Sequence, residues 1–147
     1  MRSLALGCIF ALAMGATLAA ADVPTGWKIL RDSRHHCQLA VPGDWTVAGA
    51  VATAPDGAAS ATLGVVETIS WAESKARAKT VLPPQKMIED RAQRMWFAFA
   101  EGPAGPPGWY ASVPGKGYPC TAEIHAKDAA SFERTARKIV DSLGPGS

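Results

Sequence analysis

The most reactive side chains of the sequence stand together at His35, His36 and Cys37. Imidazole nitrogen and thiolate sulfur are good ligands for zinc and copper. Neighbouring residues of a strand point to opposite faces, however, so adjacent histidines are poorly placed to bind one ion. A site would need further ligands, such as Glu123 or His125, and a disulfide-bonded Cys37 could not bind as a thiolate. We expect a solvated turn and no bound metal, with metal binding through His35 and His36 as the alternative.

The remaining chemistry-bearing residues form no catalytic motif. The sequence lacks Gly-x-Ser-x-Gly, a phosphate-binding loop, His-Glu-x-x-His and Gly-x-Gly-x-x-Gly. Asp44 and Asp56 lie in turn sequences, where aspartate is favoured for local hydrogen bonds. Lys75, Arg77 and Lys79 fit the solvated face of a helix better than an anion site. We therefore predict no catalytic residues, no cofactor and no enzymatic activity, although an enzyme without a known motif stays open.

Composition excludes several other classes of protein. The 147 residues include 15 Lys and Arg against 13 Asp and Glu, a formal net charge of +2. Such a balance gives no electrostatic basis for binding nucleic acid. With 48% hydrophobic and 19% charged residues, the chain matches an ordinary globular domain. We expect the partner to be a protein or a small molecule. No motif in the sequence identifies that partner or indicates the oligomeric state.

The start of the chain has the pattern of an export signal. A short basic start precedes an apolar run over residues 4–18, and small residues follow at Ala19–Ala21. We predict a signal peptide at 1–21 and a single globular domain at 22–147, in a periplasmic or secreted bacterial protein without a membrane span after cleavage. One alternative is an uncleaved anchor, although the run is short for a span of ~20 residues. The other is a lipoprotein, but Cys8 lies inside the apolar run instead of after it.

Cleavage would leave Cys37 and Cys120 as the only cysteines. An even number of cysteines in an exported chain favours a disulfide. Both residues lie on predicted strands, in phase with the apolar residues of those strands. We predict a Cys37–Cys120 bond, and two separate buried thiols are the alternative.

The elements that would position these residues are mostly strands. Period-2 alternation and flanking turn residues predict strands at 27–31, 37–41, 45–47, 51–53, 59–66, 94–100, 109–113 and 118–126. Helical spacing predicts helices over 71–80, capped by Ser70 with Glu73, and from Asp128 to the Gly144-Pro145 stop. Residues 85–93 fit both patterns, and we favour a short helix or irregular segment to Arg91.

Two parts of this order carry a family resemblance. One is Val41-Pro42-Gly43-Asp44-Trp45 followed by Pro55-Asp56-Gly57-Ala58-Ala59-Ser60, and the other is the closing Lys138-Ile139-Val140-Asp141-Ser142-Leu143. Together they resemble small exported domains of the PsbP and DcrB type. The resemblance implies an α+β fold, a largely antiparallel sheet between helices in an α/β/α sandwich. It also implies a non-catalytic exported binding or accessory module, without assigning site residues.

Overall fold

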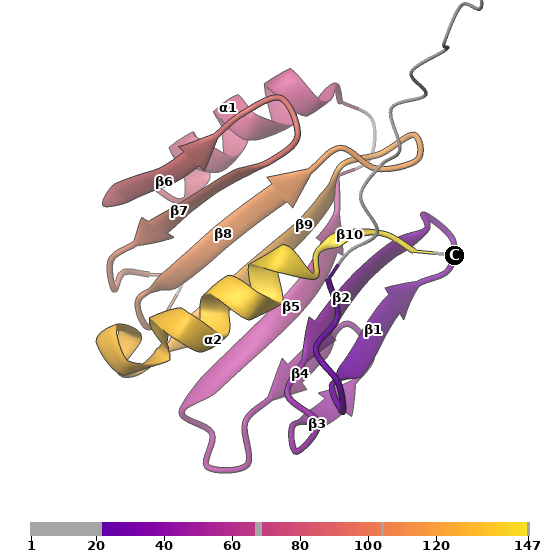
Figure 1. Cartoon of the computed structure of the whole chain (residues 1–147). Coiled ribbons are helices and arrows are strands. Elements are labelled where there is room, and N and C mark those ends of the chain that lie inside the picture. The colour runs from indigo at the N-terminus through magenta and orange to yellow at the C-terminus, as the bar shows by residue number, and fades with distance from the viewer. Residues whose placement is uncertain (1–21, 67–68, 104, 147) are drawn as a thin grey trace, which may run out of the picture.

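The strands form two antiparallel sheets in the computed structural model, which describes residues 22–66, 69–103 and 105–146 (Figure 1). The larger sheet has the order β3-β4-β5-β9-β8-β7-β6, and the smaller has the order β1-β2-β10. In chain order the larger sheet contains β3 (Thr46–Ala48), β4 (Val51–Thr53), β5 (Ala59–Val65), β6 (Lys86–Asp90), β7 (Met95–Phe99), β8 (Gly108–Val113) and β9 (Cys120–Ala126). The smaller contains β1 (Lys28–Asp32), β2 (Cys37–Val41) and β10 (Gly144–Pro145). The predicted signal peptide lies outside the described residues.

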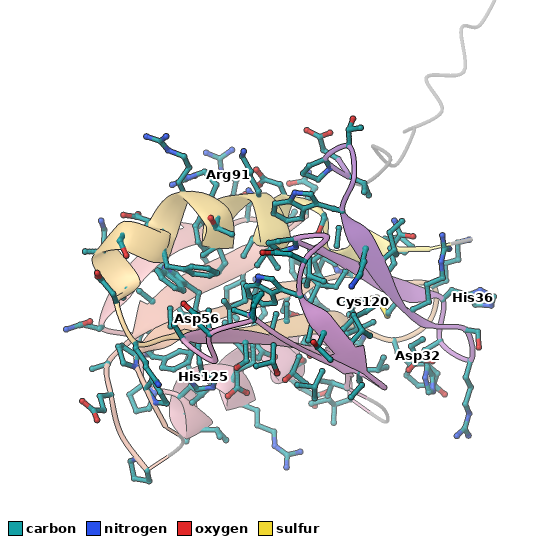
Figure 2. All side chains as sticks on the ribbon, turned by 90° about the horizontal axis from the view of Figure 1, so that it is seen from below. Asp32, His36, Asp56, Arg91, Cys120 and His125 are labelled. Carbon is teal, nitrogen blue, oxygen red and sulfur yellow. A yellow bond between two sulfur atoms is a disulfide. The ribbon has the colours of Figure 1, made fainter. Side chains whose placement is uncertain are left out.

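The two helices, α1 (Trp71–Val81) and α2 (Ala129–Asp141), lie on opposite faces of the larger sheet (Figure 2). The face under α2 also receives the smaller sheet, since β2 contacts both α2 and β9. This arrangement confirms the predicted α+β class, with a largely antiparallel sheet between helices. No helix in the described ranges is long and apolar enough to cross a membrane.

The alternation of β9 explains why the two faces differ. Ala122 and Ile124 are fully buried in the core beneath α2. Glu123 and His125, between and beyond them, project from the opposite face and are only half-buried. Because successive side chains of a strand point to opposite faces, one strand supplies core to α2 and polar groups to the α1 side.

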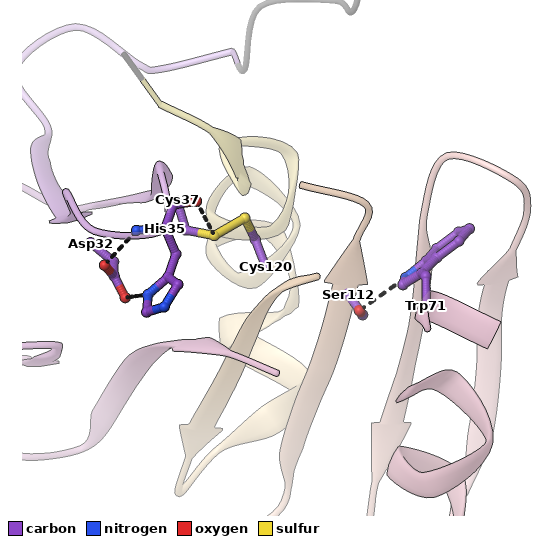
Figure 3. The surroundings of a disulfide bond; sticks show 6 residues. All are labelled: Asp32, His35, Cys37, Trp71, Ser112 and Cys120. Carbon is purple, nitrogen blue, oxygen red and sulfur yellow. Dashed lines mark hydrogen bonds and ion pairs between the residues drawn. A yellow bond between two sulfur atoms is a disulfide. The ribbon is translucent and has the colours of Figure 1, made fainter. Parts of the chain in front are cut away.

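The predicted disulfide is confirmed. Cys37 in β2 and Cys120 in β9 are bonded, with their Cα atoms 5.6 Å apart across a sequence separation of 83. Both residues are fully buried. The bond therefore joins the smaller sheet to the centre of the larger one, across the core (Figure 3).

Both predicted helices begin at the expected caps. The Ser70 side chain accepts a hydrogen bond from the backbone of Glu73, whose carboxylate accepts one from Ser70 N in return. Asp128 caps α2 by accepting from the backbone N–H of Ser131. Caps of this kind satisfy backbone donors that the first helical turn leaves unpaired. The apolar spacing of α2 buries Ala136, Ile139 and Val140.

The preference for a helix or irregular segment up to Arg91 is wrong. Residues 86–90 form strand β6, which pairs with β7 through Met87↔Phe97 and Asp90↔Met95. A β-bulge between Met87 and Glu89 shifts the register. Because a bulge inserts an extra residue, it interrupts the period-2 pattern by which a strand is identified. The two-residue β10, which pairs with β2, was also not predicted.

Candidate functional site

The cluster at His35, His36 and Cys37 does not converge on one site. The Nδ1 atom of His35 lies 2.9 Å from Oδ2 of Asp32 (Figure 3). His36 is exposed in the following turn with a positive φ of 57°, and Cys37 is committed to the disulfide. The hydrogen bond from His35 lowers the pKa of Asp32, which burial opposes. This turn is therefore a local hydrogen-bonded structure, in which His36 is exposed while the side chain of His35 is mostly buried.

Glu123 and His125 were the further metal ligands that the sequence offered. Their side chains lie next to each other on the same face of β9. Nε2 of His125 lies 2.6 Å from Oε1 of Glu123, and its Nδ1 lies 2.8 Å from the carbonyl oxygen of Pro106. His125 and His36 are well separated (Figure 2). Across the described ranges no three His, Cys, Asp or Glu side chains gather as a metal site would require.

The aspartates of the two turns are placed as expected. Asp56 accepts a hydrogen bond from the backbone N–H of Ala58 at 2.9 Å, within its own turn. Asp44 is exposed in the turn before Trp45. The hydrogen bond of Asp56 therefore stabilises its own turn.

A cavity of about 210 Å³ opens between α1 and the larger sheet. We call it the α1 groove; its walls are Val66, Ser74, Arg77, Ala78, Val81, Leu82, Tyr110 and Glu123. The helical residues at 74, 77, 78 and 81 follow the i, i+3, i+4, i+7 spacing of a single helix face. The sheet supplies Tyr110 and Glu123, which are direct cross-strand partners in β8 and β9. Helix periodicity and strand register together assemble this site.

The buried polar group of the α1 groove is Ser74. Its side chain is only 2% exposed, and its Oγ makes no well-formed hydrogen bond among the described residues, although it lies near the phenol of Tyr110. Burying a hydroxyl without a partner costs about 1–3 kcal/mol. Native proteins keep few such groups, so each needs an explanation, such as an ordered water or a ligand that binds there.

Tyr110 forms the floor of the α1 groove beside Glu123. Burial raises the pKa of the Tyr110 phenol, although the nearby hydroxyls of Thr121, Ser112 and Ser74 act against this. The negative charge of Glu123 raises that pKa further. The phenol is therefore a neutral hydrogen-bonding group next to a carboxylate, and both belong to the same wall of the cavity.

The cations of α1 divide between two sides of the helix. Lys75 and Lys79 bind the two carboxylate oxygens of Asp90 in β6, at 2.9 and 2.8 Å. The hydrogen bond from Lys79, followed by that from Lys75, lowers the pKa of Asp90. Arg77, on the groove side, forms no ion pair with any residue that the structure describes. The three basic residues expected on a solvated helix face thus differ in their contacts. Two are lysines paired with Asp90, and the third is an arginine that lines the α1 groove.

Two other cavities lie at the far end of the sheet. One, of about 250 Å³, lies between the turn at Gly57 and His125, and the other, of about 230 Å³, lies beside Trp45 and the start of α2. Neither is lined by a buried polar atom that lacks a partner, within the described parts of the chain. The α1 groove is therefore the candidate functional site.

Sequence reasoning missed this site for an identifiable reason. The helical stripe at Ser74, Arg77, Ala78 and Val81 was visible in the sequence, but it contains only one strongly apolar residue. The sheet side depends on the β8–β9 register, which pairs Tyr110 with Glu123. Neither the helical stripe nor the Tyr110–Glu123 pair indicates a pocket by itself.

Comparison with solved structures supports the fold. The chain is similar to the solution structure of cyanobacterial PsbP (CyanoP) from Synechocystis sp. PCC 6803, with a TM-score of 0.55 and 13% sequence identity. The match covers 91% of this chain and 98% of that chain. No protein-family model and no curated protein sequence matches the chain. The PsbP-like fold is thus supported by structure over nearly the whole chain.

Proposed function

We propose that this chain is a non-catalytic exported module that binds a small amphipathic molecule in the α1 groove. The observation that carries the proposal is the Ser74 hydroxyl, buried in the wall of a cavity and left without a hydrogen-bond partner among the described residues. A bound ligand would supply that partner. Mostly apolar walls with a few converging polar groups are typical of small-molecule sites.

Export is supported by two independent features. The Cys37–Cys120 disulfide is a type of bond that persists in oxidising compartments. The first residues of the sequence follow the order of a secretory signal. We infer a periplasmic or secreted location from these features. Metal binding through His35 and His36 gains no support, because His35 contacts Asp32 while His36 is exposed in the turn.

A neutral probe tests the proposed function. We expect 3-methylbutan-1-ol to cause saturable amide shifts along α1 and around Tyr110 in ¹H–¹⁵N spectra of the oxidised protein. Ala78→Leu should fill the groove and abolish the shifts, whereas Ala76→Leu, at an exposed position of the same helix, should leave them unchanged. Val81→Phe, at a rim position that is 67% exposed, should block the groove without altering the core. Shifts that survive both groove variants would contradict the proposal.

A further inference from the structure

We infer that the α1 groove takes a small zwitterion with an apolar side chain, the chemistry of a free aliphatic α-amino acid. This inference rests on the proposed function of the groove and adds the ligand class. It follows from the opposite charges of the two walls, since α1 contributes Arg77 and the sheet contributes Glu123.

The wall formed by α1 suits a carboxylate. Arg77 lies three residues after Ser74, so the two side chains occupy successive turns of one helix face. Arg77 has no described ion-pair partner, unlike Lys75 and Lys79, which share Asp90. Arginine and a neighbouring hydroxyl are both donors toward carboxylate oxygens. Binding a carboxylate would therefore satisfy the buried Ser74 hydroxyl and pair the guanidinium in one step.

The wall formed by the sheet suits an ammonium group. Oε1 of Glu123 is held by His125, whose other ring nitrogen is held by Pro106. This chain of contacts fixes the carboxylate, and its second oxygen has no partner among the described residues. The phenol of Tyr110, the cross-strand partner of Glu123, offers an additional acceptor. An ammonium donates three hydrogen bonds and needs acceptors of this kind.

The size and apolar lining of the groove set the rest of the ligand. Val66, Ala78 and Leu82 add aliphatic surface to the lining of the groove. The cavity volume of about 210 Å³ equals about seven waters at the ~30 Å³ that each occupies in the liquid. It is smaller than the ~300–1,000 Å³ pockets that hold drug-sized ligands. A single amino acid with a branched aliphatic side chain fits a space of this size.

Four probes that share one 3-methylbutyl chain test the ligand class. They are leucine, 4-methylpentanoate, which lacks the ammonium, 3-methylbutylamine, which lacks the carboxylate, and the neutral 3-methylbutan-1-ol. We expect leucine to bind at least tenfold more tightly than each of the other three, measured by amide shifts that map to the α1 groove. Equal affinities for all four would overturn the zwitterion while leaving the proposed binding function intact. Binding of none of them at the groove would overturn both.

Matched variants test the assigned roles. Arg77→Met and Glu123→Gln should each weaken leucine binding at least tenfold. Two control variants make the same charge changes at exposed positions of α2, far from the groove: Arg134→Met matches Arg77→Met, and Glu133→Gln matches Glu123→Gln. Neither control should change the affinity for leucine more than twofold. Arg77→Met should not weaken the binding of 3-methylbutylamine, because that probe has no carboxylate. Equal losses for Arg77→Met and Arg134→Met would overturn the inference, since overall charge would then explain the binding.

Discussion

The two faces of the larger sheet hold their helices by different means. α2 buries Ala136, Ile139 and Val140 in a continuous core with β2, β8 and β9. α1 buries only Ser74 and Ala78, and its neighbouring cluster is the smaller one around Met95, Phe97 and Phe99. Its other attachments are polar. The α2 face therefore carries most of the stability, which leaves the α1 face free to keep an open groove.

Polar contacts attach α1 to strands β6 and β8 of the larger sheet. Trp71 donates from Nε1 to Ser112 Oγ at 3.1 Å, and Lys75 and Lys79 bind Asp90. Exposed ion pairs contribute at most about 1 kcal/mol each. Such contacts fix the position of a helix without filling the space beneath it, which is what a ligand site needs.

The largest effect should come from removing the disulfide on the α2 face. Replacing both Cys37 and Cys120 with alanine should lower the free energy of unfolding by about 4 kcal/mol, because the bond closes a long loop in the unfolded chain. Urea denaturation of the oxidised protein and the double variant measures the difference, with reduced wild type as the control. A loss below about 1 kcal/mol would show that the cross-link contributes little to the α2 face.

Core truncations should rank the two faces directly. Ile139→Ala, beneath α2, should cost about 3 kcal/mol, and Leu82→Ala, at the end of α1, about 2 kcal/mol, since truncating buried aliphatic residues costs about 2–5 kcal/mol. Leu82 already borders the groove, so its removal creates less new cavity. Denaturant midpoints with unchanged slopes provide the measurement. A larger loss for Leu82→Ala would reverse the proposed division between the faces.

Two serines beneath α1 should respond with opposite signs. Ser112→Ala removes the acceptor of the Trp71 indole and should destabilise the protein by about 1 kcal/mol. Ser74→Ala removes a buried hydroxyl without a partner and introduces a better helix former, so it should stabilise by about 0.5–1 kcal/mol. Thermal and urea unfolding of both variants tests this pair. Destabilisation by Ser74→Ala would show that its hydroxyl already has a stabilising role in the free protein.

The smallest expected effect is a loss of folding stability at acidic pH. The pKa of Asp90 is lowered in the folded protein by Lys79 and Lys75, so the unfolded state binds its proton more readily. Its contribution is therefore present above the ordinary pKa of 3.8 and is lost as the pH falls below that value. We expect a loss below about 1 kcal/mol, since the pair is exposed and screened by salt.

Asp90→Asn should remove that part of the acid dependence, and high salt should reduce it in the wild type. Stability measured at pH 6 and at pH 3, at two salt concentrations, separates these effects. An unchanged pH dependence in Asp90→Asn would show that the lysines attach α1 by something other than this charge.

The sequence was most informative where one periodicity applied without interruption. The alternation of Cys37 with Leu39, and of Cys120 with Ala122, placed both sulfurs on core-facing sides, and the bond followed. β6 escaped prediction because its bulge breaks the alternation at Ile88. The groove escaped because Tyr110 and Glu123 meet only through the β8–β9 register. Local patterns predict elements, whereas a site built across elements depends on their pairing.

The central place of β9 has a consequence for how the chain folds. In the larger sheet β9 lies between β3-β4-β5 on one side and β8-β7-β6 on the other. Each of these triplets joins strands that are consecutive in sequence, so each can form through local contacts as soon as it is made. Neither can be joined to the other until β9, which follows both, has been synthesised. Contacts between distant segments slow folding, so the chain would remain as two separate meanders, with Cys37 unpaired, until β9 has been made.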